Sequence, residues 1–169
     1  MKKKYLFWIT GLPGSGKTTI AKNIKKDIEK AYGPTIEISG DNLRKIFKFK
    51  SFKMKDREKY AKNYSAFCKF LINKGYNVIF STVSLHNIVH KLNRKQIKNY
   101  YEIYVKTDIK KLIKLNKKKI YKKKKDVIGL DLKVDFPKKP NLVVKNDLKK
   151  NINKISREVL KNILKDCKI

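Results

Sequence analysis

Short apolar runs alternate with amphipathic stretches along most of this chain. The runs are rich in β-branched and aromatic residues and have the length of buried strands. They cover residues 5–10, 35–39, 77–82, 101–105 and 142–145. Strands that alternate with helices predict a parallel sheet covered on both faces. We therefore expect an α/β fold, a three-layer sandwich with a five-stranded parallel sheet and helices on both faces.

The segments between these runs show helical periodicity. Ile20, Ile24 and Ile28 recur every four residues, as a buried helix stripe does. Further helices are expected at 41–47, 56–73, 87–98, 108–116 and 148–164. In the second of these, Tyr60, Tyr64, Phe67 and Leu71 share one face, which indicates core packing rather than a platform for nucleic-acid bases.

Residues 116–141 do not fit this alternation. Seven lysines lie between Lys117 and Lys125, and Gly129, Pro137 and Pro140 interrupt the segment. Long segments without regular structure in a compact domain are usually functional or disordered. A solvated loop is one interpretation. The other, which we favour, is a basic lid over about 117–140 that closes on phosphates and excludes water from phosphoryl transfer.

The length and the residue usage limit the class of protein. A chain of 169 residues fits one domain, residues 1–169, with a proper core. No apolar run approaches the roughly 20 residues of a membrane span, so no membrane partner is expected. Cys68 and Cys167 have no metal-binding spacing and are interpreted as plain thiols of a cytoplasmic protein.

The net charge of +31 raises the alternative of a nucleic-acid-binding protein with a vestigial phosphate loop. Only four of the 45 basic residues are arginines, which proteins use for bidentate contacts to bases and phosphates. The lysines are spread over every segment and indicate a compositional bias on solvated faces. We therefore expect no specific nucleic-acid partner, although so basic a surface attracts polyanions and steers anionic nucleotides.

Gly11 to Thr18 follow the phosphate-loop pattern G-x-x-x-x-G-K-T, between a predicted strand and a predicted helix. Such loops bind nucleotide phosphates through backbone N–H groups and the positive end of the helix dipole. The predicted ATP-binding residues are Gly11, Gly14, Ser15, Gly16, Lys17, Thr18 and Thr19. Lys17 can reach the β- and γ-phosphates, and the Thr18 hydroxyl can ligate Mg²⁺.

A second motif, "SGDNLR" at residues 39–44, follows the second predicted strand. In parallel sheets the ligand lies beyond the carboxyl ends of the strands. Asp41 can therefore touch Mg²⁺, directly or through a water, or accept a proton from a substrate hydroxyl. Arg44, one helical turn on, can hold a substrate phosphate. Alternatively, Asp41 only caps its helix. The base-reading N-K-x-D of GTPases is absent, and the small size favours a small-molecule kinase.

These motifs together resemble the adenylyl-sulfate kinase family over nearly the whole chain. The matching segments are "GLPGSGKT", "SGDNLR", "FKMKDR", "TVSL", "IYKK" and "IGLDLKVDFPKKP". The resemblance implies a P-loop kinase that phosphorylates the ribose 3′-hydroxyl of adenylyl sulfate with MgATP, and it leaves room for a homodimer. It implies catalytic roles for Lys17, Asp41 and Ser84. The implied acceptor-binding residues are Asp41, Asn42, Arg44, Phe52, Arg57, Val83, Ser84, Lys122 and Val127.

Several departures from the family pattern concern the acceptor. The family stacks the acceptor's adenine between two Phe rings, of which Phe52 survives while the second falls on Val127. The family's E-N-x-R-R becomes "KYAKN", and the lid is shorter. Tyr60 or Phe136 could restore the missing ring. The acceptor is therefore either adenylyl sulfate or, as in the cytidine diphosphoramidate kinase branch associated with capsule modification, a cytidine nucleotide. In some members the matching Ser has been regarded as a phosphorylated intermediate, but direct in-line transfer is physically simpler.

Overall fold

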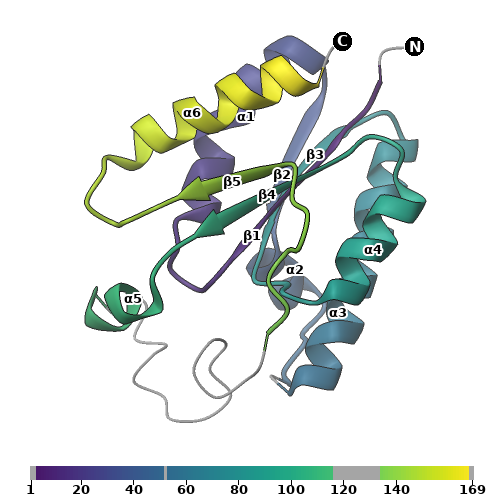
Figure 1. The fold of residues 1–169 in the computed structure, drawn as a ribbon. Helices are drawn as coiled ribbons and strands as arrows, with labels where there is room; N and C mark the ends of the chain where they lie inside the picture. The colour runs from purple at the N-terminus through teal and green to yellow at the C-terminus, as the bar shows by residue number, and fades with distance from the viewer. Residues whose placement is uncertain (1–2, 52, 116–133, 168–169) are drawn as a thin grey trace.

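The computed structural model describes residues 3–51, 53–115 and 134–167, and its core is a five-stranded parallel sheet. The strand order is β2-β3-β1-β4-β5, so the first strand lies in the middle (Figure 1). The strands are β1 (Leu6–Gly11), β2 (Thr35–Ser39), β3 (Asn77–Thr82), β4 (Tyr100–Lys106) and β5 (Leu142–Lys145). The predicted α/β fold is confirmed.

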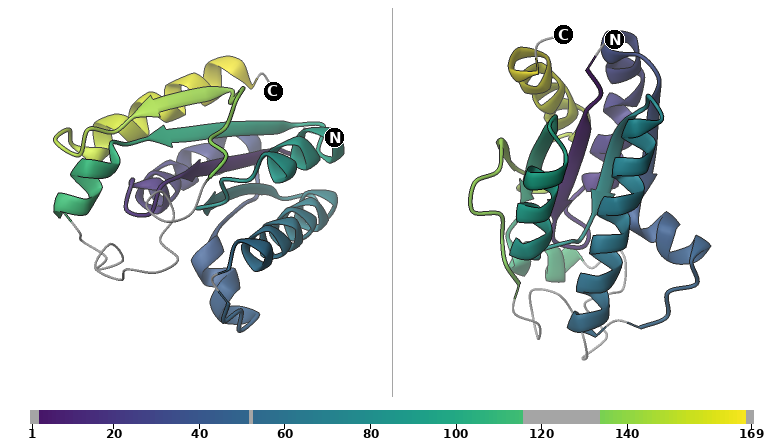
Figure 2. Two further views of the ribbon diagram at one scale, coloured as in Figure 1. Left: turned by 60° about the horizontal axis from the view of Figure 1, so that its bottom comes forward. Right: turned by 90° about the vertical axis from the view of Figure 1, so that its right-hand side faces the viewer.

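Helices cover both faces of this sheet, as the turned views show (Figure 2). The helices are α1 (Lys17–Tyr32), α2 (Gly40–Ile46), α3 (Met54–Asn73), α4 (Asn87–Gln96), α5 (Ile109–Leu115) and α6 (Ile152–Asp166). Helices α1 and α6 pack on one face, and α2, α3 and α4 lie against the other. Within the described part of the chain, no helix combines the length and apolar character that crossing a membrane requires.

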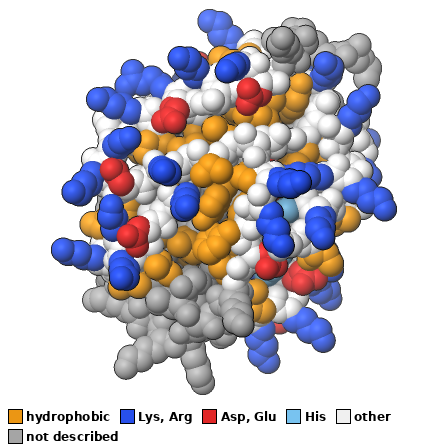
Figure 3. All heavy atoms as spheres, viewed as in Figure 1, with side chains coloured by type: hydrophobic (Ala, Val, Ile, Leu, Met, Phe, Trp, Pro, Cys, Tyr) orange, Lys and Arg blue, Asp and Glu red, His pale blue; other side chains and the backbone are white. Residues whose placement is uncertain are grey.

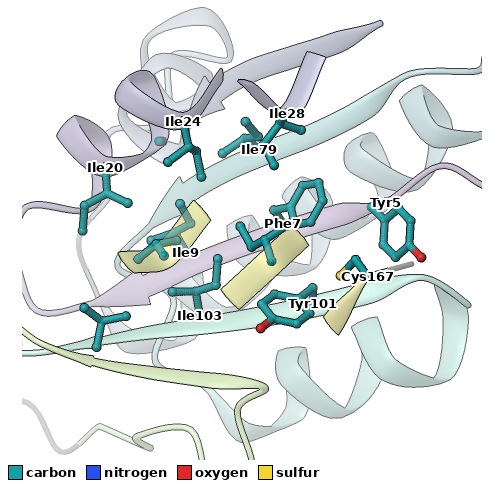
Figure 4. Packing of buried hydrophobic residues seen from close by; sticks show 14 of the residues in the cluster. Tyr5, Phe7, Ile9, Ile20, Ile24, Ile28, Ile79, Tyr101, Ile103 and Cys167 are labelled. Atoms are coloured by element: carbon teal, nitrogen blue, oxygen red, sulfur yellow. The ribbon is translucent and has the colours of Figure 1, made fainter. Parts of the chain in front are cut away.

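The two faces of β1 supply two separate hydrophobic cores. Successive side chains of a strand point to opposite faces. Phe7 and Ile9 accordingly pack with the Ile20, Ile24 and Ile28 stripe of α1 (Figure 4). Leu6 and Trp8 pack instead with residues of α2, α3 and α4. Because β1 is buried on both faces, its position is fixed firmly, and so is the start of the phosphate loop that follows it.

The helix boundaries differ from the sequence-based expectation where local capping decides them. Helix α6 begins at Ile152 rather than at residue 148. Leu148 has a left-handed φ of 66°, and the Asn151 side chain caps the helix by accepting from the Asn153 N–H. Helix α3 begins at Met54, two residues earlier than expected, and α4 ends at Gln96 rather than at residue 98. Tyr64 of the α3 stripe is buried and the rest is partly buried, which confirms the predicted core role.

The segment after residue 133 is tied to α4 and β4. The Asp135 N–H donates to the Leu85 carbonyl (3.0 Å), and the Asp135 carboxylate accepts from the Asn87 N–H (3.2 Å) at the start of α4. Further along, Arg94 of α4 donates to the Lys139 carbonyl and pairs with the buried carboxylate of Glu102 on β4. These contacts fix the path of the chain into β5.

Candidate active site

The phosphate loop lies between the end of β1 and the start of α1. At Gly11, where φ is +151°, a Cβ would lie 2.5 Å from the Val105 carbonyl oxygen, so only glycine lets β1 leave the sheet here. Gly16 is the N-cap of α1 and adopts a left-handed conformation with φ 96°. The loop therefore has the backbone conformation that directs consecutive N–H groups toward an anion.

Lys17 and Thr18 lie in the first turn of α1 and contact different neighbours. The Lys17 ammonium is buried and donates to the Leu12 carbonyl (2.7 Å) within its own loop. The Thr18 hydroxyl lies 3.2 Å from the hydroxyl of Ser81, near the end of β3. Thr19 is exposed on the first turn. The predicted ATP-binding residues therefore form one continuous loop at the carboxyl edge of the sheet.

The strand order brings the two predicted acceptor segments to one side of this loop. Thr10 of β1 pairs in register with Thr82 of β3, and Ser81 of β3 pairs with Ser39 of β2. The segments that follow β2 and β3 therefore lie next to one another and next to the phosphate loop. Because parallel sheets bind ligands at this edge, these two segments stay the predicted place for the acceptor.

Asp41 lies in the first turn of α2, which Ser39 caps. The Ser39 hydroxyl accepts from the Asn42 N–H (3.1 Å), and the Asn42 side-chain oxygen accepts from the Ser39 N–H (3.1 Å). This reciprocal pair, rather than Asp41, caps the helix, so the alternative capping role of Asp41 is not needed. Gly40 allows close packing, because a Cβ there would lie 2.8 Å from the Thr82 hydroxyl. Asp41 itself is exposed at the sheet edge.

Arg44 belongs to a cluster that links α2 to the start of α3. Its Nη1 donates to the carbonyls of Phe49 (3.3 Å) and Ser51 (3.0 Å), and its guanidinium lies 5.4 Å from the ring centroid of Tyr60. Tyr60 in turn stacks on Phe49, with centroids 4.0 Å apart. Burial raises the pKa of the neighbouring Tyr64 hydroxyl, an effect that Arg44 opposes and Asp41 reinforces. The charges of Asp41 and Arg44 therefore both act on the Tyr64 hydroxyl.

The loop after β3 carries Val83 and Ser84. The Ser84 carbonyl accepts from the Thr10 hydroxyl (3.0 Å), which joins this loop to the end of β1. The Ser84 side chain is only 3% exposed, and its hydroxyl has no hydrogen-bond partner among the described residues. Val83 is half-buried against the small apolar cluster around Leu12 and Leu85. Ser84 thus does not present its hydroxyl to solvent, and its predicted catalytic role stays a prediction.

His86 lies two residues after Ser84 and is buried at the start of α4. Burial lowers the pKa of its imidazole, and His90 and, to a smaller extent, Arg57 lower this pKa further. Glu58 and, to a smaller extent, Asp135 raise it. Arg57 is thus within electrostatic range of His86, and its acceptor-binding role stays a prediction.

Three predicted acceptor residues, Phe52, Lys122 and Val127, lie outside the described residues, as does most of the predicted lid at 117–140. Both rings considered as a replacement for the second stacking Phe are described. Tyr60 stacks on Phe49, and Phe136 packs against Tyr104 with centroids 5.7 Å apart. Each of these rings is thus paired with another aromatic ring of the protein.

The sequence motifs did not single out Ser81 or Asn146, although both contact the phosphate loop. The buried Asn146 side chain donates to the Ser15 carbonyl (2.9 Å). Both residues lie at or just after the carboxyl end of a strand, and that position is the signal that could have found them.

Lys and Arg side chains are spread over the face seen in Figure 3 rather than gathered in one patch, as the lysine-rich composition indicated.

A sequence profile of the adenylylsulphate kinase family matches residues 3–145, which include the phosphate loop, α2 and the loop after β3. The chain belongs to the adenylylsulphate kinase family. It is therefore a nucleotide kinase, and the predicted family and enzyme class are confirmed.

Individual relatives of this adenylylsulphate kinase family member fall into two groups. The cytidine diphosphoramidate kinase of Campylobacter jejuni is 35% identical over 94% of this chain and 96% of its own length. The adenylyl-sulfate kinase of Buchnera aphidicola from Acyrthosiphon pisum is 27% identical over 90% of this chain and 79% of its own length. Among solved structures, the Mycobacterium tuberculosis APS kinase in complex with AMPPNP and APS matches with a TM-score of 0.85 and 25% identity, over 96% of this chain and 99% of that one.

Proposed function

We propose that this kinase transfers the γ-phosphoryl group of MgATP to the ribose 3′-hydroxyl of a 5′-activated cytidine nucleotide, cytidine diphosphoramidate. The observation that carries the choice of a pyrimidine is the pairing of Tyr60 with Phe49 and of Phe136 with Tyr104. We take these pairings to mean that neither ring replaces the second Phe of the family's purine sandwich, which falls on Val127 in this sequence. One stacking partner on a base is worth roughly 1–3 kcal/mol, enough to change the preference between nucleotides.

The similarity to relatives supports the same choice. The cytidine diphosphoramidate kinase is 35% identical and matches along nearly its full length, whereas the adenylyl-sulfate kinase from Buchnera aphidicola is 27% identical. A kinase with this acceptor would belong to capsular polysaccharide modification. In the proposed complex Arg44 and Arg57 hold the anionic 5′ group, and Phe52 covers the base.

The phosphoryl donor side rests on the phosphate loop. Its N–H groups and the Lys17 ammonium, released from the Leu12 carbonyl, bind the β- and γ-phosphates. Mg²⁺ prefers oxygen ligands and keeps several waters and phosphate oxygens. The Thr18 hydroxyl, 3.2 Å from that of Ser81, and the exposed Asp41 carboxylate fit such an ion. When bound, it would offset negative charge on the phosphates.

The acceptor side rests on Asp41. We assign its exposed carboxylate, at the same sheet edge, to take the proton from the 3′-hydroxyl as that oxygen attacks the γ-phosphorus, while ADP leaves on the opposite side. Direct in-line transfer is supported by the burial of Ser84, because a phosphorylated intermediate would require its hydroxyl to meet the γ-phosphate. We assign Ser84 and Val83 to positioning the acceptor through the loop after β3.

Adenylyl sulfate is the second candidate acceptor. The retained "SGDNLR" and "FKMKDR" motifs and the match to the family profile favour it. With this acceptor the product would be 3′-phosphoadenylyl sulfate.

The deciding experiment measures kcat/KM for cytidine diphosphoramidate and for adenylyl sulfate side by side, with MgATP saturating. We expect the cytidine nucleotide to be preferred by about tenfold or more, the ratio that one stacking contact supplies. A preference of a hundredfold for adenylyl sulfate would overturn the proposal in favour of the second candidate. Cytidine 5′-diphosphate serves as the control that lacks the 5′ amidate group.

A further inference from the structure

Asn146 connects the end of β5 to the phosphate loop. It is the first residue after the strand, its side chain is 4% exposed, and its backbone N–H donates to the Lys106 carbonyl (2.9 Å) at the end of β4. Its side-chain amide donates to the Ser15 carbonyl (2.9 Å). A residue 131 positions away in the sequence thus contacts the loop backbone directly before Gly16.

This contact fixes the direction of one peptide group of the loop. In a trans peptide the C=O and the following N–H point in opposite directions. Because the Ser15 carbonyl points at Asn146, the Gly16 N–H points away from Asn146. Gly16 has φ 96° and caps α1, and the N–H groups of such a left-handed residue and its neighbours form an anion-binding concavity.

The loop has little room to turn in the other direction. A Cβ on Gly16 would lie 3.1 Å from the Asn146 amide nitrogen and 2.9 Å from the Ile152 side chain, so both residues pack directly on this glycine. Rotation of the Ser15–Gly16 peptide would break the bond to Asn146 and leave a buried amide without its acceptor, which is costly.

Asn146 is itself held in place by its own turn. Its side-chain oxygen accepts from the Leu148 N–H (2.9 Å), and Leu148 has the left-handed φ of 66° that a non-glycine residue seldom adopts. Leu148 also packs with the apolar cluster around Leu12 and Leu112. The amide is thus anchored through its oxygen, its backbone N–H and its neighbour's packing, with its nitrogen aimed at the loop.

We propose that Asn146 is a positioning residue for the phosphoryl donor, which holds the Ser15–Gly16 peptide with its N–H toward the nucleotide phosphates. It acts through the loop and not by touching the acceptor. Its removal should therefore weaken binding of MgATP and MgADP and leave the acceptor KM unchanged.

The test measures MgADP binding by calorimetry, which needs no acceptor and so is independent of the acceptor proposed above. For Asn146→Ala we expect the Kd of MgADP to rise about tenfold, a change equivalent to about 1.4 kcal/mol. The KM for MgATP should rise in parallel, with the acceptor KM within twofold of wild type. Asn146→Asp keeps the side-chain oxygen that accepts from the Leu148 N–H. It replaces the amide nitrogen that donates to the Ser15 carbonyl with a second carboxylate oxygen, so that hydrogen bond is lost. It should weaken MgADP binding at least as much, at both low and high salt.

Asn23→Ala is the matched control. The Asn23 amide also makes two hydrogen bonds, to Asn153 (3.0 Å) and Ser156 (3.0 Å), and joins α1 to α6 away from the phosphate loop. It should change thermal stability without changing the Kd of MgADP. The proposal is overturned if Asn146→Ala binds MgADP within twofold of Asn23→Ala. Should the alanine variant not fold, wild-type affinity in Asn146→Asp at high salt overturns it equally.

Discussion

The rings of Phe49 and Tyr60 lie nearly parallel, with centroids 4.0 Å apart and an interplanar angle of 5°. Phe49 belongs to the loop after α2, and Tyr60 lies in the second turn of α3. The Arg44 guanidinium lies near the Tyr60 ring and donates to the Phe49 carbonyl. The stack therefore ties the described residues of the loop after α2, and through Arg44 helix α2 itself, to α3.

Truncation of Tyr60 should loosen this loop and weaken acceptor binding. We expect Tyr60→Ala to lower the free energy of unfolding by roughly 2–4 kcal/mol, as for a partly buried aromatic side chain, and to raise the acceptor KM several-fold. Tyr60→Phe, which keeps the stack, should stay close to wild type in both. Phe70→Ala is the control, because Phe70 lies on the same helix with 54% of its surface exposed. Urea unfolding and steady-state kinetics check both expectations; equal effects of the Tyr60 and Phe70 truncations would contradict the role of the stack.

Lys17 should be required for phosphoryl transfer but not for folding. Removal of a preorganised positive charge from the developing phosphoryl charge typically costs two to three orders of magnitude or more in kcat. We expect Lys17→Ala to lower kcat by at least about a hundredfold while the circular dichroism spectrum is retained. Lys22→Ala, one turn further along α1, controls for the loss of charge alone. Undiminished turnover in Lys17→Ala would contradict the role of Lys17 in phosphoryl transfer.

Asp41 and Arg44 should affect different kinetic parameters, although both lie in α2. Asp41→Asn removes the proton acceptor and should lower kcat by about a hundredfold or more, since general-base contributions are typically of that size. Arg44→Ala removes an anion contact and should mainly raise the acceptor KM. Lys45→Ala, an exposed neighbour, is the control. Steady-state kinetics with both substrates varied separates these effects, and a mainly KM effect of Asp41→Asn would argue against its catalytic role.

His86 should make the folded state less stable in acid. Burial lowers the pKa of this imidazole below its usual value of 6.5, so between the two values the unfolded chain binds more protons than the native protein. Stability should therefore be complete above about pH 6.5 and fall as the pH decreases toward the native pKa. Urea unfolding at a series of pH values checks this. His86→Gln should lose part of the decline below about pH 6.5, and an unchanged decline would assign it to other titratable groups.

The sequence by itself determined most of the strands and helices and the position of the phosphate-loop motif. Buried parallel strands are continuous apolar runs, so β1 and β3 could be found from local pattern alone. The phosphate loop is a contiguous motif whose chemistry is local. Helix ends were less predictable, because the Ser39–Asn42 pair and the Asn151 cap depend on how side chains meet backbone at the element boundary.

Only the tertiary structure decided which distant residues support that site. The strand order places the end of β5 so that Asn146 reaches Ser15, and places β3 so that Ser81 meets Thr18. Only the tertiary structure showed that the Tyr60 ring stacks on the Phe49 ring. Hydrogen bonds and ring contacts between segments depend on side-chain packing in three dimensions. The amino-acid sequence gives the type of each residue but does not show which distant residue it contacts.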